Sequence, residues 1–108
     1  MAYDKILAER VRSALLPGTK EQTMFGGLAF MIEGNMCCGV IGNLLVLRLG
    51  PKGTADALKE PHTREMDFAK KVIKSMIYVE PDGFASDAQL RAWLQKAIEF
   101  TCSLPPKT

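Results

Sequence analysis

Two glycine-asparagine dipeptides, Gly34-Asn35 and Gly42-Asn43, divide an apolar stretch of this chain into three short segments. A dipeptide of this kind between apolar runs favours a two-residue hairpin turn, because both residues tolerate a positive φ. The segments 28–33, 36–41 and 44–49 are rich in the aliphatic and β-branched side chains that strands prefer. The sequence therefore predicts three consecutive strands that pair as an antiparallel meander.

Two-residue turns also predict which residues of the meander face one another. The expected pairs are Ile41 with Leu44, Gly39 with Val46, Cys37 with Arg48, Phe30 with Gly39, and Ile32 with Cys37. Because alternate residues of a strand point to opposite faces, the side chains divide into two sets. One set holds Ala29, Met31, Met36, Cys38, Val40, Leu45, Leu47 and Leu49. The other holds Leu28, Phe30, Ile32, Cys37, Gly39, Ile41, Leu44, Val46 and Arg48.

Both predicted faces of the meander are apolar, whereas an antiparallel sheet with helices on one face usually carries polar residues on the other. We therefore expect the second face to meet another subunit, a ligand or a partner protein. The expected interaction residues are Phe30, Ile32, Cys37, Val46 and Arg48. The alternative is that the chain covers both faces itself. Arg48 needs a partner such as Glu33 or Glu65, or a place on the rim, because burial of an unpaired guanidinium is unfavourable.

Helical patterns flank the meander. Apolar residues spaced by three and four predict a helix over 4–16, and Ser86-Asp87-Ala88-Gln89 has the form of a capping box at the start of a last helix. A short helix is expected over 54–59. Further strands are expected over 23–27, 65–68 and 76–79, with a bulge or tight corner at Gly26-Gly27. The predicted fold is a single α+β domain over 1–108: a two-layer α/β sandwich with helices packed on an antiparallel sheet.

Composition narrows the class of protein. The chain has 108 residues, a net charge of +2 and a pI near 8.5, which is well short of a protein built around a phosphate backbone. No apolar run reaches the roughly 18 residues of a membrane span, and the first residues lack the apolar core of a signal peptide. Three cysteines, two of them adjacent, are typical of free thiols in a reducing compartment. These features predict a cytoplasmic location.

Candidate chemistry is sparse. Cys37 and Cys38 are adjacent on a predicted strand, so we expect them on opposite faces, where they would not bind one ion together. His62, the only histidine, lies in a predicted loop without a nucleophile motif. The sequence predicts no catalytic residue, no metal and no cofactor. Six methionines fit a core as well as a soft-metal site. The basic residues between the last two strands are a weak nucleic-acid signal: Lys70, Lys71 and Lys74.

These segments together resemble the TfoX N-terminal domain. The resemblance rests on Met24-Phe25-Gly26-Gly27-Leu28-Ala29-Phe30-Met31, Gly34-Asn35-Met36, Leu47-Arg48-Leu49, Met66-Asp67-Phe68, Tyr78-Val79 and the Trp93 helix. It implies a fold similar to secretion-chaperone-like domains, in the order α-β(3-4)-α-β(2)-α, which often self-associate. Full-length TfoX proteins regulate bacterial natural competence together with the cyclic-AMP receptor protein and add a C-terminal domain. The resemblance carries no catalytic residue onto this sequence.

The sequence thus supports a non-enzymatic regulatory module that binds proteins and self-associates as a homodimer. One alternative is a DNA-associated accessory factor in transcription, which would use the basic segment. Another is a protein that responds to a small ligand or a soft metal through Met36, Cys37 and Arg48. No membrane partner is expected.

Overall fold

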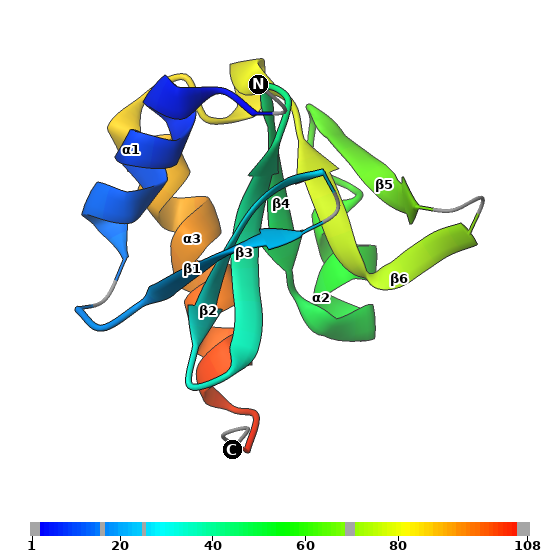
Figure 1. The fold of residues 1–108 in the computed structure, drawn as a ribbon. Coiled ribbons are helices and arrows are strands. Elements are labelled where there is room, and N and C mark those ends of the chain that lie inside the picture. Colours follow the sequence, from blue (N-terminus) through cyan, green and yellow to red (C-terminus); the bar gives the residue numbers. More distant parts are fainter. Residues whose placement is uncertain (1–2, 16, 25, 69–70, 106–108) are drawn as a thin grey trace.

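Short hairpins organise the sheet, with the second turn at Gly42-Asn43 as predicted and the first turn one residue earlier than predicted. The computed structural model describes residues 3–15, 17–24, 26–68 and 71–105. Strands β2 (Gly27–Ile32), β3 (Asn35–Ile41) and β4 (Leu44–Arg48) pair antiparallel in chain order, which confirms the meander. Strand β1 (Lys20–Met24) pairs with β2, and β6 (Lys71–Val79) pairs with β4 and with β5 (Thr63–Phe68). The resulting sheet has the order β1-β2-β3-β4-β6-β5 (Figure 1).

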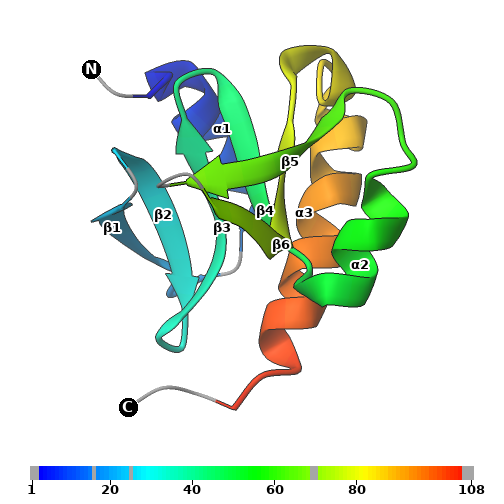
Figure 2. The ribbon, with the colours of Figure 1, turned by 90° about the vertical axis from the view of Figure 1, so that its right-hand side faces the viewer.

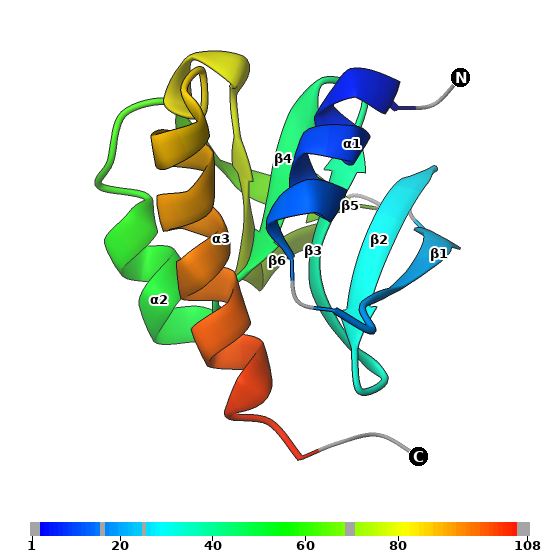
Figure 3. The same ribbon diagram turned by 90° about the vertical axis from the view of Figure 1, so that its left-hand side faces the viewer.

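Capping side chains set the starts of the two longer helices. In α1 (Lys5–Ala14) the Asp4 carboxylate accepts hydrogen bonds from two backbone N–H groups of the first turn. The capping box at Ser86 and Gln89 is present at the start of α3 (Asp87–Cys102), as predicted. Helices α1 and α3 lie side by side on one face of the sheet, and α2 (Gly50–Ala57) packs against β6 (Figure 3). The two-layer α+β fold is therefore confirmed.

The main core lies between these helices and the sheet, and we call it the helix-side core. Helix α1 contributes Leu7 and Val11, and α3 contributes an apolar stripe of Leu90, Trp93, Leu94 and Ala97. The sheet supplies large buried side chains to the same core: Phe30, Val40, Leu45, Leu47, Ile77 and Val79. The indole Nε1 of Trp93 donates a hydrogen bond to the Gly83 carbonyl at 3.1 Å, so its polar atom is satisfied inside the core.

Several element boundaries differ from the sequence predictions. The polar residues 20–22, which precede the strand expected over 23–27, form most of β1, because an exposed edge strand tolerates charged side chains. Helix α2 begins at Gly50 instead of residue 54, with Pro51 in the first turn, where its missing N–H has no helical partner. The predicted basic loop is also partly wrong: Lys71 and Lys74 lie within β6, and Lys70 falls outside the described residues.

The predicted register between β2 and β3 is wrong, because the turn lies one residue earlier than predicted and a β-bulge then interrupts the pairing. The hairpin turn uses Glu33 and Gly34, both at positive φ, and Met31 faces Met36. The next residue of β2, Phe30, faces Cys38, so Cys37 is an extra residue without a direct partner. Relative to β4, all the β2 side chains therefore lie on the opposite faces from those predicted, so that Phe30 and Ile32 contact the helix-side core. The register of β3 with β4 is as predicted for Ile41 with Leu44 and Gly39 with Val46.

The glycine pair at the start of β2 forms the predicted tight corner. Gly26 has a φ of +76°, which is unfavourable for a residue with a side chain. Gly27 pairs with Met24 across the hairpin, and a Cβ atom there would overlap the Val40 carbonyl oxygen of β3. Gly26 is therefore needed for the turn, and Gly27 for the close contact between β2 and β3.

The sheet is curved, and its two ends bend toward the side away from α1 and α3 (Figure 2). The packing shows the same curvature, because Met66 of β5 and Ala29 of β2 belong to one buried cluster although three strands separate them. The face opposite the helices is therefore concave.

Candidate functional site

The concave face carries a second apolar cluster, which we call the concave-face cluster. Its buried members come from four strands: Ala29, Met36, Val46 and Met66. Half-buried side chains surround them: Met31, Ile41, Ile73, Met76 and Tyr78. Because α1 and α3 cover the opposite face, these half-buried groups form the apolar surface that this side of the sheet presents. Methionine is well suited to such a surface, because its unbranched side chain adapts to different partners.

The structure divides the five residues that the sequence grouped as one interaction face. Val46 lies in the concave-face cluster and is fully buried. Phe30 and Cys37 are buried in the helix-side core, and Ile32 packs against that core. The prediction that these residues share one face is therefore wrong, and the bulge at Cys37 is the physical reason.

Arg48 finds its partners in places that the sequence did not indicate. Its guanidinium donates a hydrogen bond to the Met36 carbonyl at 3.4 Å and lies 5.9 Å from the centroid of the Phe100 ring. A cation near a ring face is stabilised by the ring's quadrupole. Glu33 and Glu65, the partners considered from the sequence, are exposed and form no ion pair with Arg48. Arg48 therefore links β4 to β3 and to the end of α3.

Sequence reasoning missed the contribution of β5 and β6 to the concave face. Met76 and Tyr78 alternate with Ile77 and Val79 along β6, and the two pairs lie on opposite faces. This alternation is visible in the sequence and could have predicted the contribution of β6, because a period of two marks a strand with two distinct faces. The burial of Met66 carried no such signal, because a second bulge shifts the register between Glu65 and Met66.

The two adjacent thiols also lie differently from the prediction. Cys37 and Cys38 both belong to the helix-side core and are fully buried, because the bulge turns both side chains to one face. Their side chains are hydrogen-bonded to each other, which lowers the pKa of Cys37. The same hydrogen bond, together with burial, raises the pKa of Cys38. Cys102 is exposed near the end of α3.

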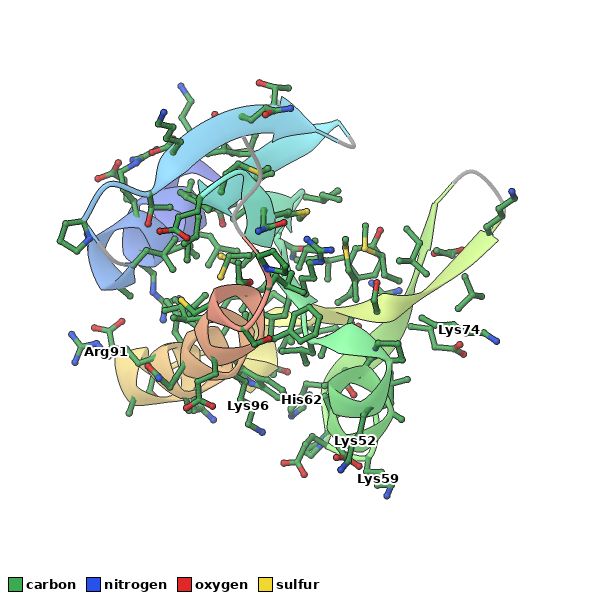
Figure 4. All side chains as sticks on the ribbon, turned by 90° about the horizontal axis from the view of Figure 1, so that it is seen from below. Lys52, Lys59, His62, Lys74, Arg91 and Lys96 are labelled. Atoms are coloured by element: carbon green, nitrogen blue, oxygen red, sulfur yellow. The ribbon has the colours of Figure 1, made fainter. Side chains whose placement is uncertain are left out.

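Several positive charges lie along one side of the molecule. Figure 4 shows Arg91 and Lys96 beside α3 and Lys52 and Lys59 beside α2 on that side, with Lys74 apart from them beside the β5–β6 hairpin. Lys71 and Lys74 are both exposed on β6. The groove between α2 and α3 beside Lys96 also holds Asp56, Glu60 and Glu99, so carboxylates interrupt the stripe of cations that a phosphate backbone would need.

The remaining candidates for chemistry are His62 and the possible metal ligands. Among the described residues, no group of three or more His, Cys, Asp and Glu side chains is arranged to hold a metal ion. His62 is exposed in the loop before β5, as predicted, with a φ of +66°. No described helix has the length and apolar character to cross a membrane.

Comparison with family models matches residues 12–101 to the TfoX N-terminal domain. The matched range covers most of the chain, from within α1 to the last turn of α3. A search of curated proteins finds no match.

Proposed function

The chain belongs to the TfoX N-terminal domain family, and from this premise we propose that it is a non-enzymatic regulatory module that acts by binding proteins. The observation that carries the proposal is the concave-face cluster. A sheet face with half-buried methionine, isoleucine and tyrosine side chains is suited to burial against a partner. The carboxylates among the cations of α2 and α3 reduce the support for the DNA-associated alternative.

We further propose that the partner on this face is a second copy of the chain. The half-buried residues come from both ends of the curved sheet, so a second sheet placed against them would bury apolar side chains from at least three strands. Tyr78 adds a polar group to this apolar surface, and its hydroxyl donates a hydrogen bond to the Asp67 carbonyl at 3.5 Å. Aromatic and methionine side chains are the types enriched at protein interfaces. A cytoplasmic role in transcription regulation belongs to the same proposal.

Ile41→Lys tests the proposed self-association. Ile41 is half-buried at the end of β3 and packs against the concave-face cluster. A lysine there would place a charge in the interface, so we expect wild type to sediment as a dimer at micromolar concentration and the variant as a monomer.

The matched control is Ile6→Lys, because Ile6 is 76% exposed on α1 and lies on the helix side of the molecule. This variant should remain a dimer. Wild type that stays monomeric at high micromolar concentration would reject self-association. Loss of the dimer in Ile6→Lys as well as in Ile41→Lys would place the interface elsewhere. Circular dichroism spectra of both variants check that the fold is retained.

A further inference from the structure

The methionine side chains that the structure describes all lie on the concave face. They come from four different strands, β2, β3, β5 and β6, and all belong to the concave-face cluster: Met31, Met36, Met66 and Met76. The helix-side core is larger and contains no described methionine. Methionine that served only to fill gaps would be divided between the two cores. Its restriction to one face therefore calls for a separate explanation.

The curvature of the sheet brings these thioethers together. Met31 and Met36 are direct partners across the β2–β3 hairpin, so their Cβ atoms lie about 5 Å apart on one face. Met66 lies on β5, and four strand spacings of about 4.8 Å would separate β5 from β2 by about 19 Å in a flat sheet. The bend places Met66 in the same buried cluster as Met36 instead (Figure 2). Sulfur-bearing side chains from distant strands therefore share the hollow of this face.

The thioether of Met36 lies at the centre of the hollow. A Cβ atom at Gly39 would lie 3.3 Å from Met36 Cε, so the end of the Met36 side chain lies over this glycine. Gly39 faces Ala29 on one side and Val46 on the other, and both are buried members of the cluster. Met31 and Met76 are half-buried, so solvent reaches the face at these two thioethers.

The side chains of the concave-face cluster select a soft, monovalent cation. Its described residues include four thioethers and one phenol, and no carboxylate, thiol or imidazole. Calcium, magnesium and zinc prefer those missing groups, whereas thioethers prefer Cu(I). A thioether is neutral and cannot offset the charge of the ion, so a monovalent ion is the least unfavourable in apolar surroundings. The Arg48 guanidinium is outside the cluster, against the Phe100 ring of α3.

We propose that the concave face binds one Cu(I) ion through its thioethers. Met36 and Met66 supply the buried ligands, and Met31 and Met76 complete the site where solvent reaches it. Binding releases no proton, because a thioether has none to lose. This inference goes beyond the proposed self-association and does not rest on it, since all four ligands come from one chain. A second copy on the same face would compete with the ion.

Ag(I) is the first probe, because it has the charge and the ligand preference of Cu(I) and is stable in air. Silver nitrate is titrated into protein labelled with ¹³C at the methionine methyl groups, in a Cys102→Ser chain that lacks the exposed thiol. We expect the methyl signals of the four cluster methionines to shift and to saturate at one ion per chain. Cu(I) kept reduced with ascorbate should produce the same pattern of shifts. Zn(II) should produce none, and equal shifts with Zn(II) would overturn the preference for a soft ion.

Two conservative variants test the ligands. Met31→Leu removes one sulfur from a half-buried position and nearly keeps the volume, so it should weaken Ag(I) binding at least about tenfold. Ile73→Leu is the matched control, because it changes a half-buried side chain of the same cluster without removing a sulfur, and it should bind as its parent does.

Three results would overturn the site: no binding of Ag(I), equal affinity in Met31→Leu and its parent, or an ion that binds without shifting the cluster methyl groups. The last result would place the ion on the buried thiols of Cys37 and Cys38. Sedimentation reports self-association separately, so a monomeric wild type would reject the dimer and leave the test of the metal site intact.

Discussion

Replacement of Thr54 by valine should raise the stability of the free protein. The hydroxyl is nearly fully buried and lacks a partner, and such a group costs about 1–3 kcal/mol relative to its hydration in the unfolded chain. Valine has the same branched shape and a similar helix propensity, so little opposes the gain. We expect an increase of about 1–2 kcal/mol in the free energy of unfolding, which corresponds to roughly 4–8 °C in Tm for a domain of this size.

Urea denaturation measures this effect, with the fluorescence of Trp93, the only tryptophan, as the signal. The midpoint should rise with an unchanged m-value. Thr101→Val is the matched control: it removes an equally buried hydroxyl that does donate a hydrogen bond, so it should lower stability by about 1 kcal/mol. If Thr54→Val is destabilised, or if both variants shift in the same direction, then the hydroxyl of Thr54 is already satisfied and the reasoning fails.

Three other predictions concern the strand contacts, the thiols and a surface ion pair. Gly27→Ala should lower stability by more than about 2 kcal/mol in thermal unfolding, because the new methyl would overlap a backbone carbonyl of β3; a change below about 0.5 kcal/mol would contradict the close contact. In the folded protein a thiol reagent should modify one cysteine per chain rapidly, and Cys102→Ser should remove that reaction; three fast thiols would show that the buried pair is accessible. The Arg12 guanidinium donates a hydrogen bond to the Glu21 carboxylate and holds the pKa of Glu21 below its usual 4.5. The ion pair therefore stabilises the fold fully above pH 4.5, and this contribution is lost as the pH falls through the lowered pKa of Glu21. Because both side chains are partly exposed, Glu21→Gln should reduce the difference in stability between pH 7 and pH 3 by at most about 1 kcal/mol, and an unchanged difference would reject the assignment.

Local signals in the chain predicted most of the elements and little of the candidate site. The capping box at Ser86 and the turn at Gly42-Asn43 act through neighbouring residues, so their effect is visible in the sequence alone. The packing of α2 against β6 depends on how the β5–β6 hairpin meets a helix that precedes it in the chain, and no local pattern encodes that contact. The lack of a hydrogen-bond partner for the Thr54 hydroxyl could not be predicted from the sequence for the same reason.

The alternation of apolar side chains determined by itself that the meander would have two apolar faces, and the glycine-rich turns determined that its strands would be antiparallel. Only the tertiary structure decided which side chain belongs to which face. One extra residue at Cys37 exchanges the faces of the β2 side chains relative to β4, and it places both adjacent thiols in the helix-side core. A strand has a side-chain period of two, so a single bulge changes every assignment that follows it, and its position depends on pairing between strands.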